Sequence, residues 1–210
     1  QPTKITWSTG QRLPEAGPQP RSGGRGAQPG LLGGAFDRNV ATRQKEADEF
    51  YASLTPPSVD AESARVMRQA LAGMLWTKQY YGFDVNEWLV KHGASPLMPN
   101  GRPTRNREWF HMVNDDIISM PDKWEYPWYA AWDLAFHTMA LSMVDVDFAK
   151  EQLALVLNDV YLHPSGQVPA YEWNFGDVNP PVHAWASLFL YNTEKQLRGA
   201  GDVDFLKRIF

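Results

Sequence analysis

Glycine and proline are spread unevenly along this chain, and that confines any fold to one part of it. Residues 1–36 hold 8 of the 16 Gly and 5 of the 16 Pro, in runs such as Gly-Gly-Arg-Gly and Leu-Leu-Gly-Gly. Such a segment buries too little apolar surface to offset the conformational entropy that ordering costs. We therefore expect a flexible or irregular arm over residues 1–36 and a folded domain over residues 37–210.

The overall composition narrows the class of protein. Hydrophobic residues make up 43% of the 210 residues and charged residues 21%, as in globular proteins. The net charge is −4 without a basic stripe, so neither nucleic acid nor an anionic membrane is an expected partner. No apolar run is long enough to span a bilayer, and no signal pattern opens the sequence, so we expect a cytoplasmic protein. The absence of Cys excludes disulfides and thiol chemistry.

The spacing of apolar residues predicts an all-α domain. We expect helices over residues 37–54, 60–81 (opened by Ser58 or Asp60), 127–143, 146–161 and 182–197, with a further helix that begins near Asp202. Residues 82–107, rich in Gly, Pro and Asn, are predicted to form a loop with room for one short strand over Val85–Leu89.

The final residues form an apolar stripe on the helix predicted from Asp202. Its members are Phe205, Leu206, Ile209 and Phe210. Since a chain rarely ends on an exposed apolar stripe, we expect either that the sequence is a fragment or that the stripe docks on a partner chain.

Tryptophan is unusually frequent. Six of the nine Trp fall between Trp109 and Trp185. Indole rings combine large apolar area with a polar tip, so this enrichment fits either a thick helical core or a site where sugars stack. Composition alone leaves both interpretations open.

The segment 120–133 holds the first group of candidate functional residues. Its Trp recur every four residues, at Trp124, Trp128 and Trp132. Pro127 suits the first turn of a helix, which places Phe136 on the Trp face, Asp133 beside it and His137 one turn further on. Burial among rings disfavours a charged Asp133, whereas a helix start favours it. Stabilisation of the helix start is the simple alternative to a chemical role.

The loop of residues 163–181 holds the second group. Its part from residue 171 onwards mixes rings with hydrogen-bonding side chains, among them Glu172, Trp173 and Asp177. Rings stack on the CH faces of sugars, while carboxylates and amides bind sugar hydroxyls. The alternative is a Pro-rich connector that plugs the core. For Asn114-Asp115-Asp116 we favour capping or salt-bridge roles over cation binding.

Other signatures of catalysis are missing from the sequence. It contains neither a nucleophile elbow, a zinc-binding His-Glu-x-x-His, a phosphate loop nor a dinucleotide fingerprint. The five His are never three or four residues apart, so no local His pair predicts a metal site. We expect no cofactor.

The Trp-rich segment resembles the catalytic-domain motif of glycoside hydrolase family 63, which includes processing α-glucosidases and mannosylglycerate hydrolase-like enzymes. The matching residues are Asp122-Lys123-Trp124-Glu125-Tyr126-Pro127-Trp128-Tyr129-Ala130-Ala131-Trp132-Asp133-Leu134-Ala135-Phe136-His137. The Tyr171–Trp185 loop, with Asn179-Pro180-Pro181, resembles the sugar-site loop of the family. Weaker similarity over residues 46–51 and 67–76 extends the resemblance to residues 36–210.

The resemblance implies part of an (α/α)6 toroid, in which six helical hairpins surround a sugar pocket. Family members invert the anomeric configuration with a general acid and a general base, and Asp133 matches the acid. The residues expected to line the pocket are Trp124, Glu125, Trp128, Trp132, Glu172, Trp173 and Asp177. The expected partner is a small-molecule carbohydrate.

The chain departs from the family pattern in two respects. It supplies under half of the helices that six hairpins need, and no position matches the general base. Glu125 and Glu172 are conceivable substitutes, but we interpret them as sugar or framework ligands. We therefore expect a fragment of an inverting hydrolase of α-glucosides or related small glycosides such as mannosylglycerate, inactive or barely active alone, that self-associates through its open faces. The alternatives are a non-catalytic carbohydrate-binding fragment, a helical scaffold, and an adaptor that binds through Phe205–Phe210.

Overall fold

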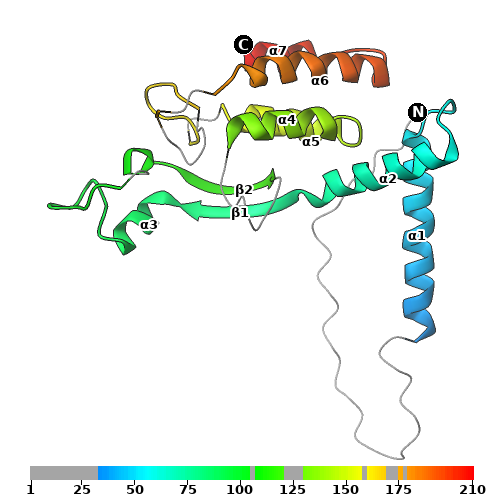
Figure 1. Ribbon diagram of the computed structural model, residues 1–210, viewed down its shortest axis with the longest axis horizontal. Coiled ribbons are helices and arrows are strands. Elements are labelled where there is room, and N and C mark those ends of the chain that lie inside the picture. The colour runs from blue at the N-terminus through cyan, green and yellow to red at the C-terminus, as the bar shows by residue number, and fades with distance from the viewer. Residues whose placement is uncertain (1–32, 105–106, 121–129, 158–159, 169–174, 177–178) are drawn as a thin grey trace, which may run out of the picture. The chain divides into compact units, whose positions relative to one another are not determined.

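A computed structural model (Figure 1) describes residues 33–104, 107–120, 130–157, 160–168, 175–176 and 179–210. The chain divides into two compact units, Gln1–Ala47 and Asp48–Phe210. The described part of the first unit is residue 33 and most of helix α1 (Gly34–Leu54). Most of the predicted arm therefore lies outside the described residues, and residues 34–36 belong to the first turn of α1. All elements that carry the candidate site belong to the second unit.

Helix α2 (Ala61–Trp76) begins where the sequence predicts. The carboxylate of Asp60 accepts hydrogen bonds from the backbone N–H groups of Glu62 and Ser63, both at 3.0 Å, as an N-cap does. The helix ends at Trp76 rather than Tyr81, because the hydroxyl of Thr77 bonds to the last turn and the chain then continues as a strand.

A two-stranded antiparallel sheet corrects the all-α prediction. Strand β1 (Lys78–Asp84) pairs with β2 (Val113–Ser119) in a register from Lys78↔Ser119 to Asp84↔Val113. The short strand predicted over Val85–Leu89 is instead helix α3 (Val85–Lys91), capped by the Asp84 carboxylate. A short 3-10 helix, η1 (Arg107–Trp109), precedes β2. The partner strand of β1 begins 29 residues after β1 ends, at Val113 after Asp84, so local periodicity could not reveal it.

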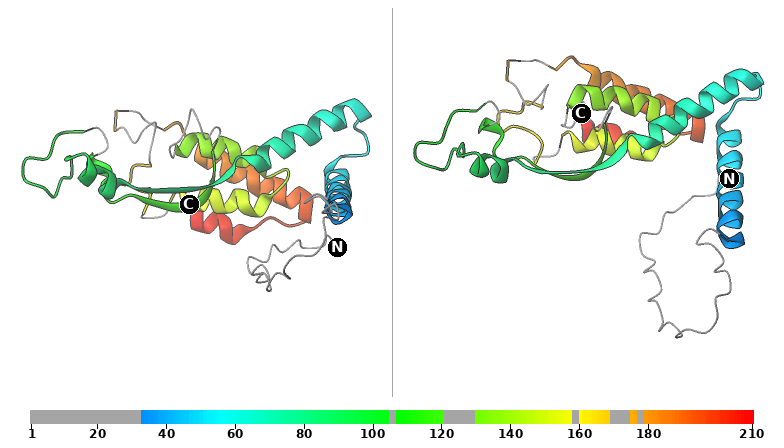
Figure 2. Two further views of the ribbon diagram at one scale, coloured as in Figure 1. Left: turned by 90° about the horizontal axis from the view of Figure 1, so that it is seen from below. Right: turned by 60° about the horizontal axis from the view of Figure 1, so that its bottom comes forward.

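Four helices form the main core of the second unit. They are α4 (Ala131–Leu141), α5 (Val146–Leu155), α6 (Val182–Arg198) and α7 (Val203–Ile209). The views of Figures 1 and 2 agree that these helices lie side by side. The core residues that they bury together are Ala135, Leu141, Ala149, Leu153, Val182, Ala186, Leu190 and Phe205. Pro127, the predicted start of the first of these helices, lies outside the described residues. Ala130 is extended, so α4 begins at Ala131, and it ends at Leu141 rather than Met143. Helix α5 ends at Leu155 rather than Tyr161.

The C-terminal stripe packs into this core. The Asp202 carboxylate caps α7 by accepting from the N–H of Phe205 at 2.8 Å. Phe205 is fully buried, Leu206 and Ile209 pack against the core, and Phe210 alone of the stripe is exposed. The predicted adaptor stripe is therefore wrong, because the chain covers three of its four residues itself.

The described elements are thus mostly helical, with one small sheet beside the helices. Within the described parts of the chain, no helix combines the length and the apolar character that crossing a bilayer requires.

Candidate functional site

Two of the eight predicted site residues lie in described parts of the chain. These two, Trp132 and Asp133, are adjacent in the first turn of α4. The remaining six fall outside the described residues: Trp124, Glu125, Trp128, Glu172, Trp173 and Asp177.

Asp133 combines a helix-start position with partial burial. Helix α4 begins after Ala130, whose side chain provides no cap hydrogen bond, so a carboxylate in the first turn is favourably placed for the helix dipole. The side chain is half-buried and interacts electrostatically with His137, one turn further along the same helix. The stabilising and the chemical interpretations of Asp133 are therefore compatible with this position.

His137 is held by side chains from outside α4. Its Nδ1 lies 2.9 Å from Oγ of Ser119, at the end of β2, and that oxygen lies 2.7 Å from Oγ1 of Thr77, just after α2. Thr77 in turn donates to the carbonyl of Met74 at 2.6 Å. Burial lowers the pKa of His137, and the nearby Asp133 only partly opposes this, so the imidazole is neutral at pH 7.

Gln152 fixes the strand end that carries Ser119. The buried Gln152 side chain of α5 accepts from the N–H of Ser119 and donates to the carbonyl of Ile117, both at 3.0 Å. It therefore bonds the outer edge of β2 as a neighbouring strand would. No sequence pattern indicated Thr77, Ser119 or Gln152 as site residues, because each comes from a different element.

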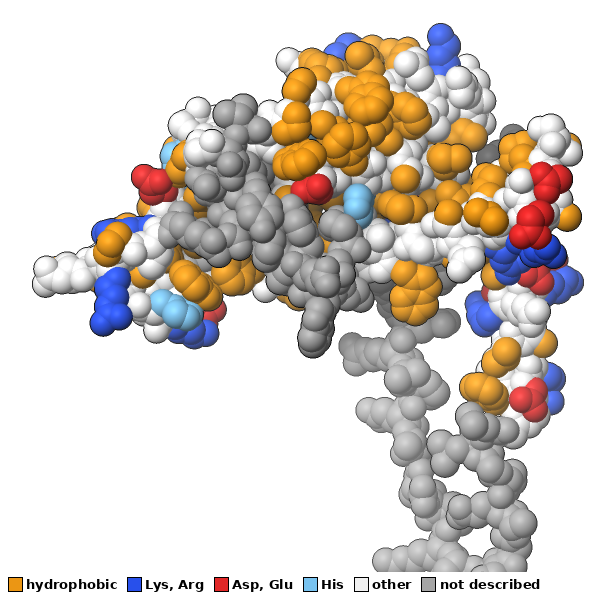
Figure 3. Space-filling model, viewed as in Figure 1, with side chains coloured by type: hydrophobic (Ala, Val, Ile, Leu, Met, Phe, Trp, Pro, Cys, Tyr) orange, Lys and Arg blue, Asp and Glu red, His pale blue; other side chains and the backbone are white. Residues whose placement is uncertain are grey.

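Exposed aromatic rings lie alongside Asp133 and His137. The ring of Phe136 contacts Trp132 of its own helix and Trp185 of α6, each with a centroid distance of 6.1 Å. Phe136 is 41% exposed and Trp185 56% exposed. Figure 3 shows hydrophobic side chains gathered over α4 and α6 on this face. Trp185 lies at the end of the predicted sugar-site loop, but it was not among the predicted site residues.

The described part of that loop contributes to packing. Phe175 stacks on the fully buried Trp109 at 5.3 Å and meets the ring of His163 edge-on at 4.6 Å. Asn179 donates to the carbonyl of Val168 at 2.9 Å. For Phe175, these contacts match the simpler of the two interpretations, a connector that packs into the core.

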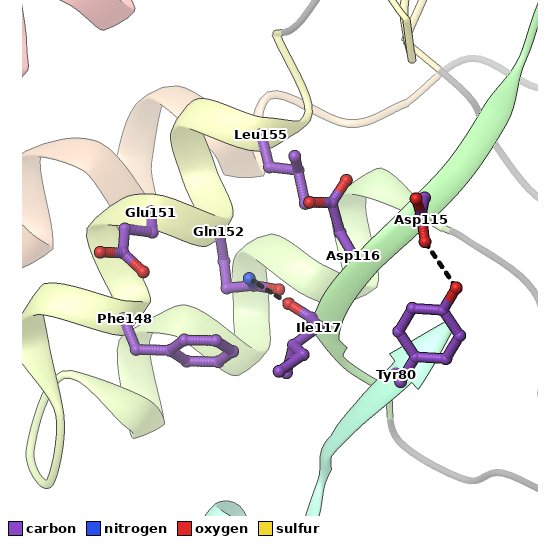
Figure 4. Close-up of a pocket in the computed structure, with 8 residues that line it drawn as sticks. All are labelled: Tyr80, Asp115, Asp116, Ile117, Phe148, Glu151, Gln152 and Leu155. Atoms are coloured by element: carbon purple, nitrogen blue, oxygen red, sulfur yellow. Dashed lines mark hydrogen bonds between the residues drawn. The ribbon is translucent and has the colours of Figure 1, made fainter. Parts of the chain in front are cut away.

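The acidic pair of β2 lines a separate pocket of about 500 Å³ between the sheet and α5 (Figure 4). Asp115 accepts from the hydroxyl of Tyr80, and Asp116 accepts from that of Tyr161. Both carboxylates thus pair with tyrosines rather than with the caps or salt bridges that the sequence favoured. The Asp115 contact raises the pKa of Tyr80. In the described regions, no group of three His, Asp or Glu side chains could hold a metal ion.

Comparison with known proteins shows a relative in yeast. No model of a protein family matches the chain, and no solved structure does either. Over 180 residues the chain is 48% identical to a Saccharomyces cerevisiae protein that carries the name "Uncharacterized protein YMR196W". The match covers 83% of this chain and 16% of the yeast protein, so the chain spans about a sixth of the length of this relative.

Proposed function

We propose that this chain is part of an inverting glycoside hydrolase that acts on α-glucosides or related small glycosides, with Asp133 as its general acid. The observation that carries the proposal is the half-buried Asp133 beside a neutral His137 and next to exposed aromatic rings. An acid that protonates a glycosidic oxygen needs a partly desolvated site, and sugar rings stack on exposed aromatic side chains. The cytoplasm is the compartment that we propose for it.

The helical part of the chain supports the architecture that such an enzyme needs. Residues 142–145 join α4 to α5, and residues 199–202 join α6 to α7, so each pair has the short connection of a helical hairpin. We propose that these hairpins are part of an (α/α)6 toroid whose other hairpins lie outside this chain.

A general acid alone cannot complete the reaction. Inversion also requires a general base roughly 6.5–9.5 Å from the acid, with room for the attacking water between the two. We propose that the base lies outside this chain and that the chain by itself is inactive or barely active. The large part of the yeast relative beyond the match offers room for such a residue.

The exposed face of α4 and α6 fits this proposal. Its large apolar side chains with at least 38% exposure include Phe136 of α4 and Trp185, Leu188 and Phe189 of α6, together with Met143 just after α4. A contiguous apolar surface of this kind is uncommon on a monomer and is normally covered by protein or ligand. In isolation, we expect the chain to self-associate through this face.

A chimera tests the enzymatic proposal. This chain would replace the matching segment of the yeast relative, and hydrolysis of an α-linked disaccharide and of an aryl α-glucoside would be followed by NMR to identify the first anomer released. We expect the inverted anomer. Asp133→Asn is expected to lower the rate at least about a hundredfold on the disaccharide, and less on the aryl glucoside, whose leaving group needs less protonation.

The control is Asp204→Asn, since Asp204 is an exposed residue of α7 whose only described ion pair is with Lys207. A folded chimera that hydrolyses neither glycoside would refute the proposal. Hydrolysis that survives Asp133→Asn but is lost in Glu172→Gln would overturn the assignment of the acid.

The second candidate, a non-catalytic carbohydrate-binding fragment, is favoured by the exposed Phe136–Trp185 contact. It predicts that sugars quench the Trp fluorescence of the isolated chain and that Trp185→Ala weakens this quenching, while the chimera stays inactive. No response to sugars, together with a cooperative melt, would instead indicate a helical scaffold.

A further inference from the structure

The hydrogen bonds that link Thr77 to Ser119 and Ser119 to His137 determine which ring nitrogen of His137 carries the proton. A hydroxyl group has one proton to donate. Thr77 donates its proton to the carbonyl of Met74 at 2.6 Å, so its oxygen can only accept from Ser119. Ser119 therefore donates to Thr77, and its oxygen is left to accept from Nδ1 of His137 at 2.9 Å.

We propose that Thr77 and Ser119 are positioning residues that fix neutral His137 as the Nδ1–H tautomer, so that its Nε2 is a hydrogen-bond acceptor for a hydroxyl group of the substrate beside Asp133. The class of ligand is a polyol or sugar, whose hydroxyl donates to Nε2. This inference rests on the proposed function for its ligand, whereas the tautomer follows from the hydrogen bonds alone.

The surroundings of His137 fit an acceptor role. No hydrogen bond between described residues uses Nε2, and this atom is not among the buried polar atoms that lack a partner. The hydroxyl that Nδ1 contacts is held in place, because Ser119 is 1% exposed and its backbone N–H donates to Gln152. The burial that lowers the pKa of His137 keeps the imidazole neutral at pH 7, so only one of its two ring nitrogens carries a proton.

Nitrogen NMR of the imidazole tests the tautomer directly in this chain. With ¹⁵N-labelled histidine, the protonated and unprotonated ring nitrogens of a neutral imidazole resonate far apart, and His137→Gln assigns the signal. We expect the protonated nitrogen of His137 to be Nδ1. A His137 that is mainly the Nε2–H tautomer would overturn the proposal.

Two variants of Thr77, which does not contact the imidazole, make this test more specific. Thr77→Val keeps the shape but cannot accept from Ser119, which is then free to donate to Nδ1, so we expect the majority tautomer to reverse to Nε2–H. The matched control, Thr77→Ser, retains the acceptor and should keep Nδ1–H. If Thr77→Val fails to fold, Ser119→Ala removes the bond to Nδ1 and should show the same reversal. An unchanged tautomer in the folded variant would refute the positioning role.

Kinetics of the chimera separate this inference from the proposed function. Where the chimera is active, Thr77→Val should lower kcat/KM about tenfold, the value of one hydrogen bond, and Thr77→Ser should restore it. A reversed tautomer with unchanged kcat/KM would overturn the acceptor role of Nε2. A chimera without activity in any form would count against the proposed function, and the NMR result would still decide the tautomer.

Discussion

Two polar clusters of the second unit differ in how they hold their elements together. Between α5, α6 and α7, Lys150 lies 2.9 Å from a Glu194 oxygen and 3.0 Å from an Asp202 oxygen. Between α2, β2 and α4, the polar contacts of Thr77, Ser119 and His137 are hydrogen bonds of neutral groups. The first cluster is ionic and joins three helices of the core, while the second is uncharged and lies beside the candidate acid.

The ionic cluster stabilises the packing of the helices, whereas the neutral cluster of Thr77, Ser119 and His137 orients a proton. Burial by itself would lower the pKa of Lys150, but Glu194 and Asp202 more than offset this, so its pKa lies above the ordinary value. Removal of one ion would leave partly buried charges with fewer partners, which costs more than a lost neutral hydrogen bond. The free energy of unfolding should therefore respond strongly to substitutions in the ionic cluster and weakly to substitutions in the neutral cluster.

The largest effect is expected from the core beneath the ionic cluster. Phe205 is fully buried, and its ring centroid lies 5.8 Å from Nζ of Lys150. Phe205→Ala should lower the free energy of unfolding by about 4 kcal/mol, through the cavity and the lost burial. Urea unfolding measures this, with the 73% exposed Phe210→Ala as a control that should change little. A loss below about 1 kcal/mol would mean that α7 contributes little to the core.

Loss of one ion from the cluster should rank second. Glu194 is 5% exposed and also accepts from Arg198 at 2.9 Å, so Glu194→Ala leaves Lys150 and Arg198 each short of a partner. We expect a loss of about 3 kcal/mol in urea unfolding. Lys207→Ala, which removes an exposed pair with Asp204, is the control and should be close to neutral. Equal effects of the two substitutions on the free energy of unfolding would contradict the stabilising role of the ionic cluster.

A smaller loss of stability is expected from a substitution in the neutral cluster. Ser119→Ala removes one oxygen that both Thr77 and His137 use, and should cost about 1 kcal/mol. The exposed Ser165 provides the comparison, since its replacement by Ala should change stability less. A loss from Ser119→Ala as large as that from Glu194→Ala would remove the distinction between the two clusters.

The smallest effect is a dependence of stability on pH. Burial lowers the pKa of His137 in the folded state below its ordinary value of 6.5, and that of His183 likewise. As pH falls below about 6.5, the unfolded chain therefore binds protons that the folded chain does not, so stability falls until the lowered pKa is reached. His137→Gln should flatten this decline in melts at pH 7.5 and pH 5.5, whereas the exposed His92→Gln should leave it steep. Parallel declines in both variants would contradict the burial effect at His137.

The structure confirms helix starts that depend on a capping residue next to the helix in the sequence. Asp60 and Asp202 cap α2 and α7 as predicted, since a cap bonds to residues two or three positions away. Asp133 and His137 were likewise expected one turn apart. The sequence predicts the end of a helix up to Tyr81 and a loop from residue 82 where strand β1 lies, because the pairing of β1 with β2 is a non-local contact.

By itself, the sequence determined the mostly helical class, several helix starts and the pairing of Asp133 with His137, because these depend on helical spacing and short-range capping. Tertiary structure alone decided the sheet, the burial of Phe205 and the chain from Thr77 through Ser119 to His137. Thr77 and Ser119 are 42 residues apart, and only the pairing of β2 with β1, the strand that directly follows Thr77, makes one hydroxyl the acceptor of the other. Which group donates in each of these hydrogen bonds depends on all the donors of the cluster together, and residue spacing does not encode this.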